Sequence, residues 1–178
     1  MKSREFKPPL PDPLAYFITW STYGTWLPGD QRGWVEFHHG WQLPDPVREL
    51  EALAKMQENA CLLDVEQRRE VEAQIEETCR IRGWTLHAVN CRSNHGHVVV
   101  SANQHPKRVR SQIKAWCTRR LKALEAKRHP ECSAIRENWW AERGSQRWIF
   151  DDAGLEGATL YVRDGQDGLI LTRSVSEA

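Results

Sequence analysis

This sequence contains no Cys-x-x-Cys pair and no long apolar run, and both absences narrow the class of protein. The five cysteines are odd in number and form no Cys-x-x-Cys pair, so we expect reduced thiols and neither a disulfide framework nor a zinc ribbon. No stretch approaches the roughly 20 apolar residues that span a bilayer, and the first residues lack the apolar core of a signal peptide. We therefore expect a cytoplasmic protein that has no membrane partner.

The length and composition fit one globular domain with less ordered ends. The chain has 178 residues, of which 40% are hydrophobic and 28% are charged, as is usual for a globular domain. Four prolines within residues 1–13 predict an extended arm, and residues 169–178 are predicted to be a flexible tail. Residues 14–168 are predicted to form the domain, with residues 24–63 as an insertion of loop and helix.

The net charge of +1 hides a strong separation of charge along the chain. Residues 45–77 carry ten acids and four bases, whereas residues 107–128 carry nine bases and one acid. A helix this basic is typical of proteins that bind a polyanion, most often nucleic acid, because an ordinary solvated helix face mixes both signs. The side chains predicted to contact DNA phosphates as a group are Lys107, Arg108, Arg110, Lys114, Arg119 and Arg120.

The spacing of apolar residues predicts a particular order of strands and helices. Strands are expected at 16–23, 84–91, 95–101 and 146–150, and helices at 47–82 in two segments, from Pro106 onward, and after Asp151. The residues expected to face the core from the helix after Pro106 are Val109, Ile113, Trp116, Leu121 and Leu124.

This order predicts an α+β fold of the ferredoxin-like or RNA-recognition-motif-like class. Strand, helix, strand, strand, helix, strand is the order of elements in that class. Its antiparallel sheet has helices on one face, and the other face stays open for a ligand. The helix after Asp151 would be an addition at the C-terminal end.

Two histidines separated by one residue form the main candidate site. His95 and His97 follow the polar turn Arg92-Ser93-Asn94 and lead into three valines. Because side chains alternate along a strand, both imidazoles face one side and Gly96 faces the other. Two adjacent imidazoles on a strand are half of a divalent metal site. The alternative is a pair of exposed polar residues without a ligand.

The run Ser93-Asn94-His95-Gly96-His97-Val98-Val99-Val100 resembles the His-hydrophobe-His motif of the HUH endonucleases. More narrowly, it is similar to the single-tyrosine transposases of the insertion-sequence 200/605 type and to the REP-associated tyrosine transposases. Three other stretches resemble that family: the opening strand at 16–20, residues 138–140 before the fourth strand, and residues 158–162 on the last helix. The resemblance covers about residues 14–168.

The resemblance implies a metal-dependent single-stranded DNA endonuclease and strand transferase that acts on DNA stem-loops. His95, His97 and Gln166 would hold Mg²⁺ or Mn²⁺, and Tyr161 would attack the scissile phosphate to give a 5′-phosphotyrosine link. Tyr16 and Tyr23 lie in or beside the first strand, so Tyr161 is the candidate nucleophile. Its alternative role is that of a core aromatic residue. The resemblance also implies a nucleoid-associated protein, and relatives often act as homodimers.

Two positions depart from the family pattern. Gly96 stands where the family has a bulky apolar residue, and glycine weakens a strand by about 0.5–1 kcal/mol relative to alanine. The family's third metal ligand lies one helical turn after the tyrosine, which is Gly165 here, with Gln166 one residue further. On an ideal helix, Gln166 is rotated about 140° from Tyr161, unless Gly165 unwinds the last turn. Asp164 is the other candidate ligand.

Two further functions fit the same residues. One is a non-catalytic, domesticated nucleic-acid-binding regulator that uses the open sheet face and the basic helix. Its binding would depend on salt and need no metal. The other is a metal-dependent phosphodiester hydrolase that works without a covalent step.

Overall fold

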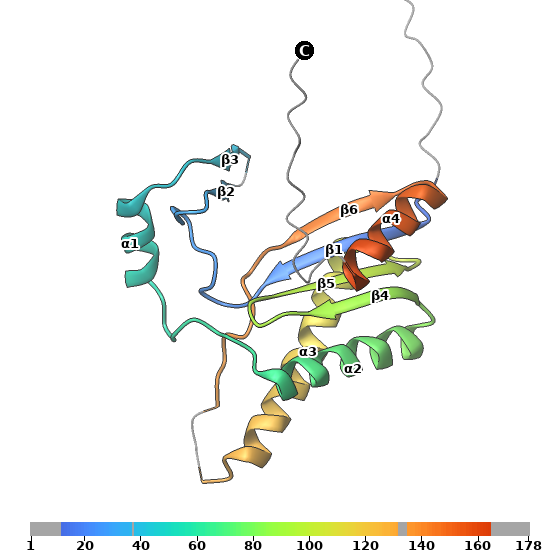
Figure 1. Cartoon of the computed structure of the whole chain (residues 1–178). Helices are drawn as coiled ribbons and strands as arrows, with labels where there is room; N and C mark the ends of the chain where they lie inside the picture. The colour runs from blue at the N-terminus through green and yellow to red at the C-terminus, as the bar shows by residue number, and fades with distance from the viewer. Residues whose placement is uncertain (1–11, 37, 132–134, 165–178) are drawn as a thin grey trace, which may run out of the picture.

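The computed structural model describes residues 12–36, 38–131 and 135–164. Along these ranges the chain forms β1 (Ala15–Ser21), β2 (Trp34–Glu36), β3 (Gly40–Gln42), α1 (Pro46–Ala54), α2 (Val65–Arg82), β4 (Thr85–Cys91), β5 (His95–Ser101), α3 (Pro106–Arg128), β6 (Ser145–Ile149) and α4 (Asp152–Arg163) (Figure 1). The predicted tail, most of the predicted arm, and Gln166 lie outside the described residues. Among the helices that the structure describes, none combines the length and apolarity needed to span a bilayer.

Four strands form one antiparallel sheet in the order β4-β5-β1-β6. Together with α2 between β1 and β4, and α3 between β5 and β6, this is the ferredoxin-like arrangement that the sequence predicts. The predicted fold class is confirmed. Because β5 lies between β4 and β1, His97 is paired with a strand on each side, and His95 is paired with β1.

The two faces of the sheet are covered by different helices. On one face, α2 and α3 pack side by side (Figure 1), and Ile18, Val98 and Ile113 are among the residues buried there. α4 lies across the opposite face, where Val162 packs in a second cluster with Val99. The face expected to be open is thus partly covered, because its small apolar residues give α4 a surface on which to bury its own.

The ends of α2 and α3 follow local signals in the sequence. Asp64 and Gln67 form a capping box at the start of α2, which satisfies two backbone N–H groups that have no partner inside the helix. Gly83 ends α2 in the left-handed conformation at φ 67°, which glycine adopts without a steric penalty. Pro106 is the first residue of α3, where its missing N–H costs nothing.

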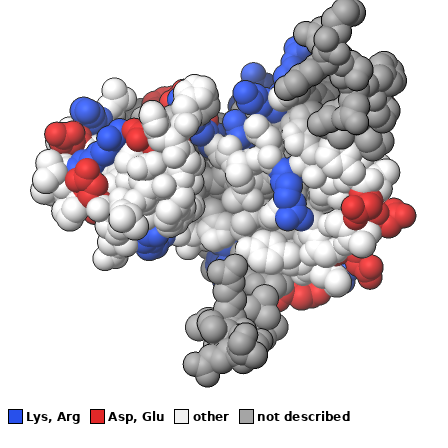
Figure 2. Space-filling view, turned by 90° about the horizontal axis from the view of Figure 1, so that it is seen from above, with Lys and Arg blue, Asp and Glu red and all other residues white. Residues whose placement is uncertain are grey.

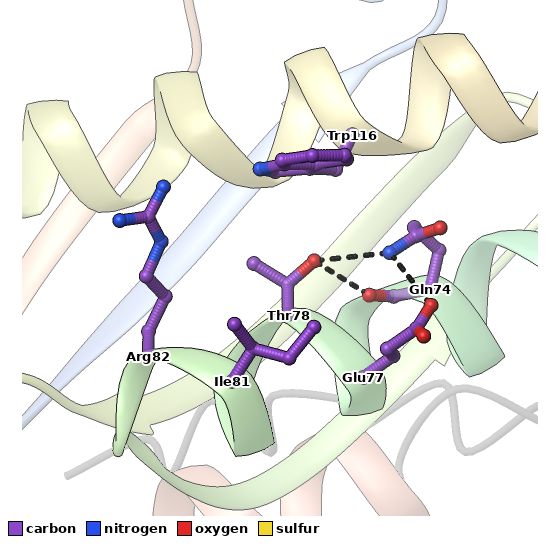
Figure 3. Close-up of a pocket in the computed structure, with 6 residues that line it drawn as sticks. All are labelled: Gln74, Glu77, Thr78, Ile81, Arg82 and Trp116. Carbon is purple, nitrogen blue, oxygen red and sulfur yellow. Dashed lines mark hydrogen bonds between the residues drawn. The ribbon is translucent and has the colours of Figure 1, made fainter.

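The predicted core face of α3 is wrong at Trp116. The buried residues continue from Ile113 to Cys117 and Leu121, since a spacing of four keeps side chains on one helix face. Trp116 is 39% exposed and lies over the groove between α2 and α3 (Figure 3). Below it, the Thr78 hydroxyl donates to the Gln74 carbonyl oxygen (2.7 Å) and accepts from the Gln74 side-chain amide (3.3 Å).

The segment 24–63 forms a lobe beside the sheet (Figure 1). It consists of the β2–β3 hairpin and α1, and no described residue of α1 is buried. The chain returns to the domain through two backbone bonds: Cys61 N–H donates to the Tyr23 carbonyl (2.8 Å) and Leu63 N–H to the Ser93 carbonyl (2.7 Å). The second bond attaches the lobe to the turn that precedes His95.

Candidate active site

β5 places the two histidines side by side on the face that α4 crosses. The register pairs His97 with Thr19 and His95 with Ser21 of β1, and pairs His97 with Asn90 of β4 on its other side. The two imidazole centroids are 4.7 Å apart, and the ring planes stand at 80° to each other. The strand alternation that brings both rings to one face is confirmed.

His97 is the more buried of the two candidate ligands. Its exposed fraction is 7%, and its Nδ1 forms a 2.8 Å hydrogen bond with the Thr19 hydroxyl. Burial, followed by the charges of His95 and Arg92, lowers the pKa of His97 to about 4. The imidazole is therefore neutral near pH 7. When Nδ1–H donates to Thr19, the lone pair of Nε2 is the one that can bind a cation.

His95 is oriented by the residue that precedes it. Its Nδ1 lies 2.7 Å from the Asn94 side-chain oxygen, and an amide oxygen can only accept, so the imidazole Nδ1–H donates in this bond. Each histidine thus has a polar partner at Nδ1, as metal-binding histidines commonly do. The tight turn at 92–94 fixes this geometry, since Arg92 N–H donates to the His95 carbonyl (2.8 Å).

Gly96, the departure from the family motif, lies directly below an aromatic ring. A Cβ built at Gly96 would come within 3.2 Å of the Trp20 ring, which is closer than ordinary van der Waals contact. Trp20 is itself 1% exposed and belongs to the main core. The indole therefore fills the space that a bulky side chain at position 96 would take, and the two imidazoles on the opposite face keep their alignment.

α4 brings Tyr161 to the histidines. The Tyr161 and His97 ring centroids are 5.9 Å apart at 82°, and Tyr161 stands at the same distance from Phe17. Phe17 in turn stacks on His97 at 5.6 Å. Tyr161 is 49% exposed, so the ring is not part of the core, and the core-aromatic alternative is not supported.

The position of Tyr161 follows from the docking of α4. Asp151 caps the helix by accepting from Gly154 N–H (2.6 Å), and Ala158 and Val162 bury its apolar side. Tyr161 precedes Val162, so its side chain emerges at the margin of the buried stripe, toward His97. α4 ends at Arg163, and both Gly165 and Gln166 lie outside the described residues.

The donor set fits a divalent cation through its two imidazoles. His97 is neutral at physiological pH, and both rings are held by bonds at Nδ1. Within the described residues, no Asp, Glu, Cys or further His completes a three-ligand group with them, and this includes Asp164. The remaining positions of a cation would fall to oxygen donors such as water, a phosphate or the Gln166 amide, which Mg²⁺ and Mn²⁺ accept.

The basic residues predicted to contact DNA lie on α3, behind the sheet. Three of them have protein partners. Arg120 pairs with Glu70 and Glu77 of α2. Arg110 donates to the Gln146 side chain (2.9 Å). Lys114 donates to the Ala141 carbonyl oxygen (2.5 Å), and burial lowers its pKa to about 8. The guanidinium of Arg119 lies over the Trp116 ring at 4.6 Å, and Lys107 and Arg108 are exposed.

Sequence reasoning missed several residues on the histidine face. Thr19 and Phe17 contact His97 from β1, and the Arg147 guanidinium from β6 lies 5.9 Å from the Phe17 ring. Figure 2 shows Lys and Arg side chains gathered over the middle of the molecule on this side. Alternation along β1 could have grouped Phe17 with Thr19, but their pairing with β5 needed the register.

The fold and the paired histidines define a ferredoxin-like α+β domain with a histidine–tyrosine site, and two of its solved structural neighbours are described as transposases. One is a REP-associated tyrosine transposase bound to a REP hairpin, with a TM-score of 0.49 and 12% identity over 89% of this chain and 70% of that chain. Another is a "putative transposase" from Deinococcus radiodurans R1, with a TM-score of 0.44 and 14% identity over 91% of this chain and 95% of that chain. No family model and no curated protein matches the sequence.

Proposed function

We propose that this chain is a transposase of the HUH type: a metal-dependent single-stranded DNA endonuclease and strand transferase with a 5′-phosphotyrosine intermediate. The observation that carries the proposal is the convergence of three rings from distant parts of the chain. The His95 and His97 centroids are 4.7 Å apart, and the Tyr161 centroid is 5.9 Å from that of His97. A nucleophile beside a cation-binding pair is the arrangement that phosphodiester cleavage needs.

In this mechanism the residues of the chain hold and orient the reacting groups. A bound Mg²⁺ or Mn²⁺ would supply Lewis-acid polarisation of the scissile phosphate. His95 and His97 would hold it, and Thr19 and Asn94 keep the two imidazoles in a fixed orientation. Gln166 is proposed as the third protein ligand. Phe17 packs against both His97 and Tyr161 and so sets the distance between ligand and nucleophile.

The covalent step exchanges one phosphodiester for another. The Tyr161 phenolic oxygen attacks phosphorus and loses its proton to water, and the bond from phosphorus to the 3′ oxygen breaks. The leaving oxygen takes up a proton to become a 3′-hydroxyl, while the 5′ phosphate stays on the tyrosine. Reversal by a different 3′-hydroxyl joins the strand to a new partner, so no nucleotide cofactor is consumed.

The test is covalent labelling with a 5′-extended, single-stranded stem-loop DNA. We expect wild-type protein with Mn²⁺ to form an adduct that survives denaturing electrophoresis and to release a 3′-hydroxyl fragment. Tyr161→Phe removes the nucleophilic oxygen, so no adduct should form. Tyr16→Phe is the matched control, because it removes a phenolic oxygen from the opposite face of the sheet. Cleavage without an adduct would instead indicate the hydrolase.

The non-catalytic regulator is the second candidate. It is favoured by the absence of a third Asp, Glu, Cys or His ligand among the described residues. It predicts that DNA binding is equally strong in EDTA and in Mn²⁺ and that no stem-loop yields an adduct. A homodimer is compatible with either function, and sedimentation with and without DNA would establish it.

A further inference from the structure

A polar pocket lies at the outer edge of the sheet, where β4 faces α2. Arg68, Arg69 and Glu72 line it from α2, and Asn90, Cys91 and Arg92 line it from the end of β4. β4 is an edge strand, so the pocket is open to solvent beside the sheet. Nothing in the tyrosine–histidine mechanism uses it.

Positive charge dominates this pocket. Three guanidinium groups meet one carboxylate, and Glu72 already accepts from Cys91 N–H through Oε1 (2.7 Å). The Arg68 Nε atom is buried and has no hydrogen-bond partner within the described ranges. A buried donor of this kind is costly unless a ligand or water satisfies it. The pocket therefore combines an unsatisfied N–H donor with an excess of positive charge among its lining residues.

Three acids of α2 are directed away from the pocket. Glu70 and Glu77 pair with Arg120, and Glu66 pairs with Arg128, both on α3. The side of α2 that lines the pocket carries Arg68, Arg69 and Glu72, so the arginines outnumber the acid among the lining residues. The sequence places most of the positive charge on α3, but after folding the local excess on α2 lies at this pocket.

The pocket adjoins the histidine pair. Asn90 lines the pocket and is the cross-strand partner of His97. A DNA strand that runs from the histidines across β4 would therefore reach the pocket at the edge of the sheet.

We propose that the pocket formed by Arg68, Arg69, Asn90 and Arg92 binds a backbone phosphate of single-stranded DNA on the strand that also carries the scissile phosphate. The identity of the strand rests on the function proposed above. Guanidinium groups bind phosphate oxygens in a bidentate manner, and the Asn90 amide adds a neutral donor. The pocket holds the strand in register with Tyr161 and takes no part in breaking the bond.

The test compares single charge removals on one helix. Arg69→Gln alters the pocket, and Arg80→Gln removes an exposed arginine from the far end of α2 as the matched control. Binding of a stem-loop oligonucleotide is measured by fluorescence anisotropy in EDTA at several salt concentrations, so it does not depend on cleavage. We expect Arg69→Gln to weaken binding roughly tenfold and to lower the salt slope by about 1. Arg80→Gln should leave both within twofold.

A second measurement locates the phosphate. Single methylphosphonate substitutions, which remove one phosphate charge, are placed at each position around the cleavage site. We expect one or two neighbouring positions to weaken binding by wild-type protein and to have no further effect on Arg69→Gln. The proposal would be contradicted if every methylphosphonate position lowered the affinity of Arg69→Gln as much as that of the wild type, or if Arg69→Gln and Arg80→Gln had equal effects on binding. If the proposed enzymatic function is wrong, no adduct forms, but the DNA binding of Arg69→Gln and Arg80→Gln can still be compared. The two failures are therefore distinguishable.

Discussion

The buried imidazole of His97 is the group whose charge state most affects the site. Burial, His95 and Arg92 lower its pKa from 6.5 to about 4. Between these values the unfolded chain binds a proton that the folded chain does not, so the free energy of unfolding falls as the pH drops from 6.5 toward 4 and levels off below that. We expect urea titrations in EDTA to show a loss of at most about 3 kcal/mol from this residue. His97→Gln should remove that part of the pH dependence; an unchanged dependence would contradict a neutral, buried His97.

Gly96 and Gly157 respond oppositely to added side chains. A Cβ at Gly96 would crowd the Trp20 ring at 3.2 Å, whereas nothing lies within 4 Å of a Cβ at Gly157. We expect Gly96→Val to lower the free energy of unfolding by about 1–3 kcal/mol through overpacking. Gly157→Ala, inside α4, should raise it by about 0.4–1 kcal/mol because alanine loses less backbone entropy. Denaturant unfolding measures both. A neutral Gly96→Val would show that Trp20 does not constrain this position.

At the scale of secondary structure, α4 depends on its cap as well as on its buried side. Asp151→Ala removes the bond to Gly154 N–H and should cost about 1 kcal/mol. Because Ala158 and Val162 are the buried residues of this helix, fraying should move Tyr161 away from His97. We expect adduct formation to slow and α4 amides to exchange faster, while Asp151→Asn, which keeps a capping oxygen, retains both. Unchanged labelling with lost amide protection would refute the link.

The elements that local chemistry specifies were predictable from the sequence, and the contacts between elements were not. The Asp64 capping box, the left-handed Gly83 and Pro106 each act within a few residues, so they fix helix ends without tertiary information. The register that joins Thr19 to His97, and the pairing of Arg120 with Glu70, link residues distant in sequence. Trp116 shows the same limit of sequence-based prediction. Its apolar character places it in the predicted core, but the buried side of α3 passes through the neighbouring Cys117.

For the molecule as a whole, folding redistributes the charges seen along the sequence. The acidic segment 45–77 includes most of α2, and the basic segment 107–128 is α3. Because α2 and α3 pack side by side (Figure 1), ion pairs join the two segments, as at Arg120 and Arg128. The strongly basic segment is thus partly neutralised within the fold. The remaining local excess of positive charge lies on the histidine side of the sheet and at the β4 edge.

This redistribution gives different expectations for residues of one helix. Lys107 is exposed at the start of α3, whereas Arg120 is paired with Glu70 and Glu77. A paired cation has fewer counterions to release when DNA binds, so Lys107→Gln should lower the salt slope of DNA binding by about 1 and Arg120→Gln by much less. Glu70→Gln, which frees one side of Arg120, should strengthen binding. Anisotropy titrations from low to moderate salt measure all three. Equal slopes for Lys107→Gln and Arg120→Gln would contradict this expectation. They would mean that DNA phosphates displace the α2 carboxylates from Arg120, because exposed ion pairs contribute only about 0–1 kcal/mol. In that case α3 would act as a single basic surface.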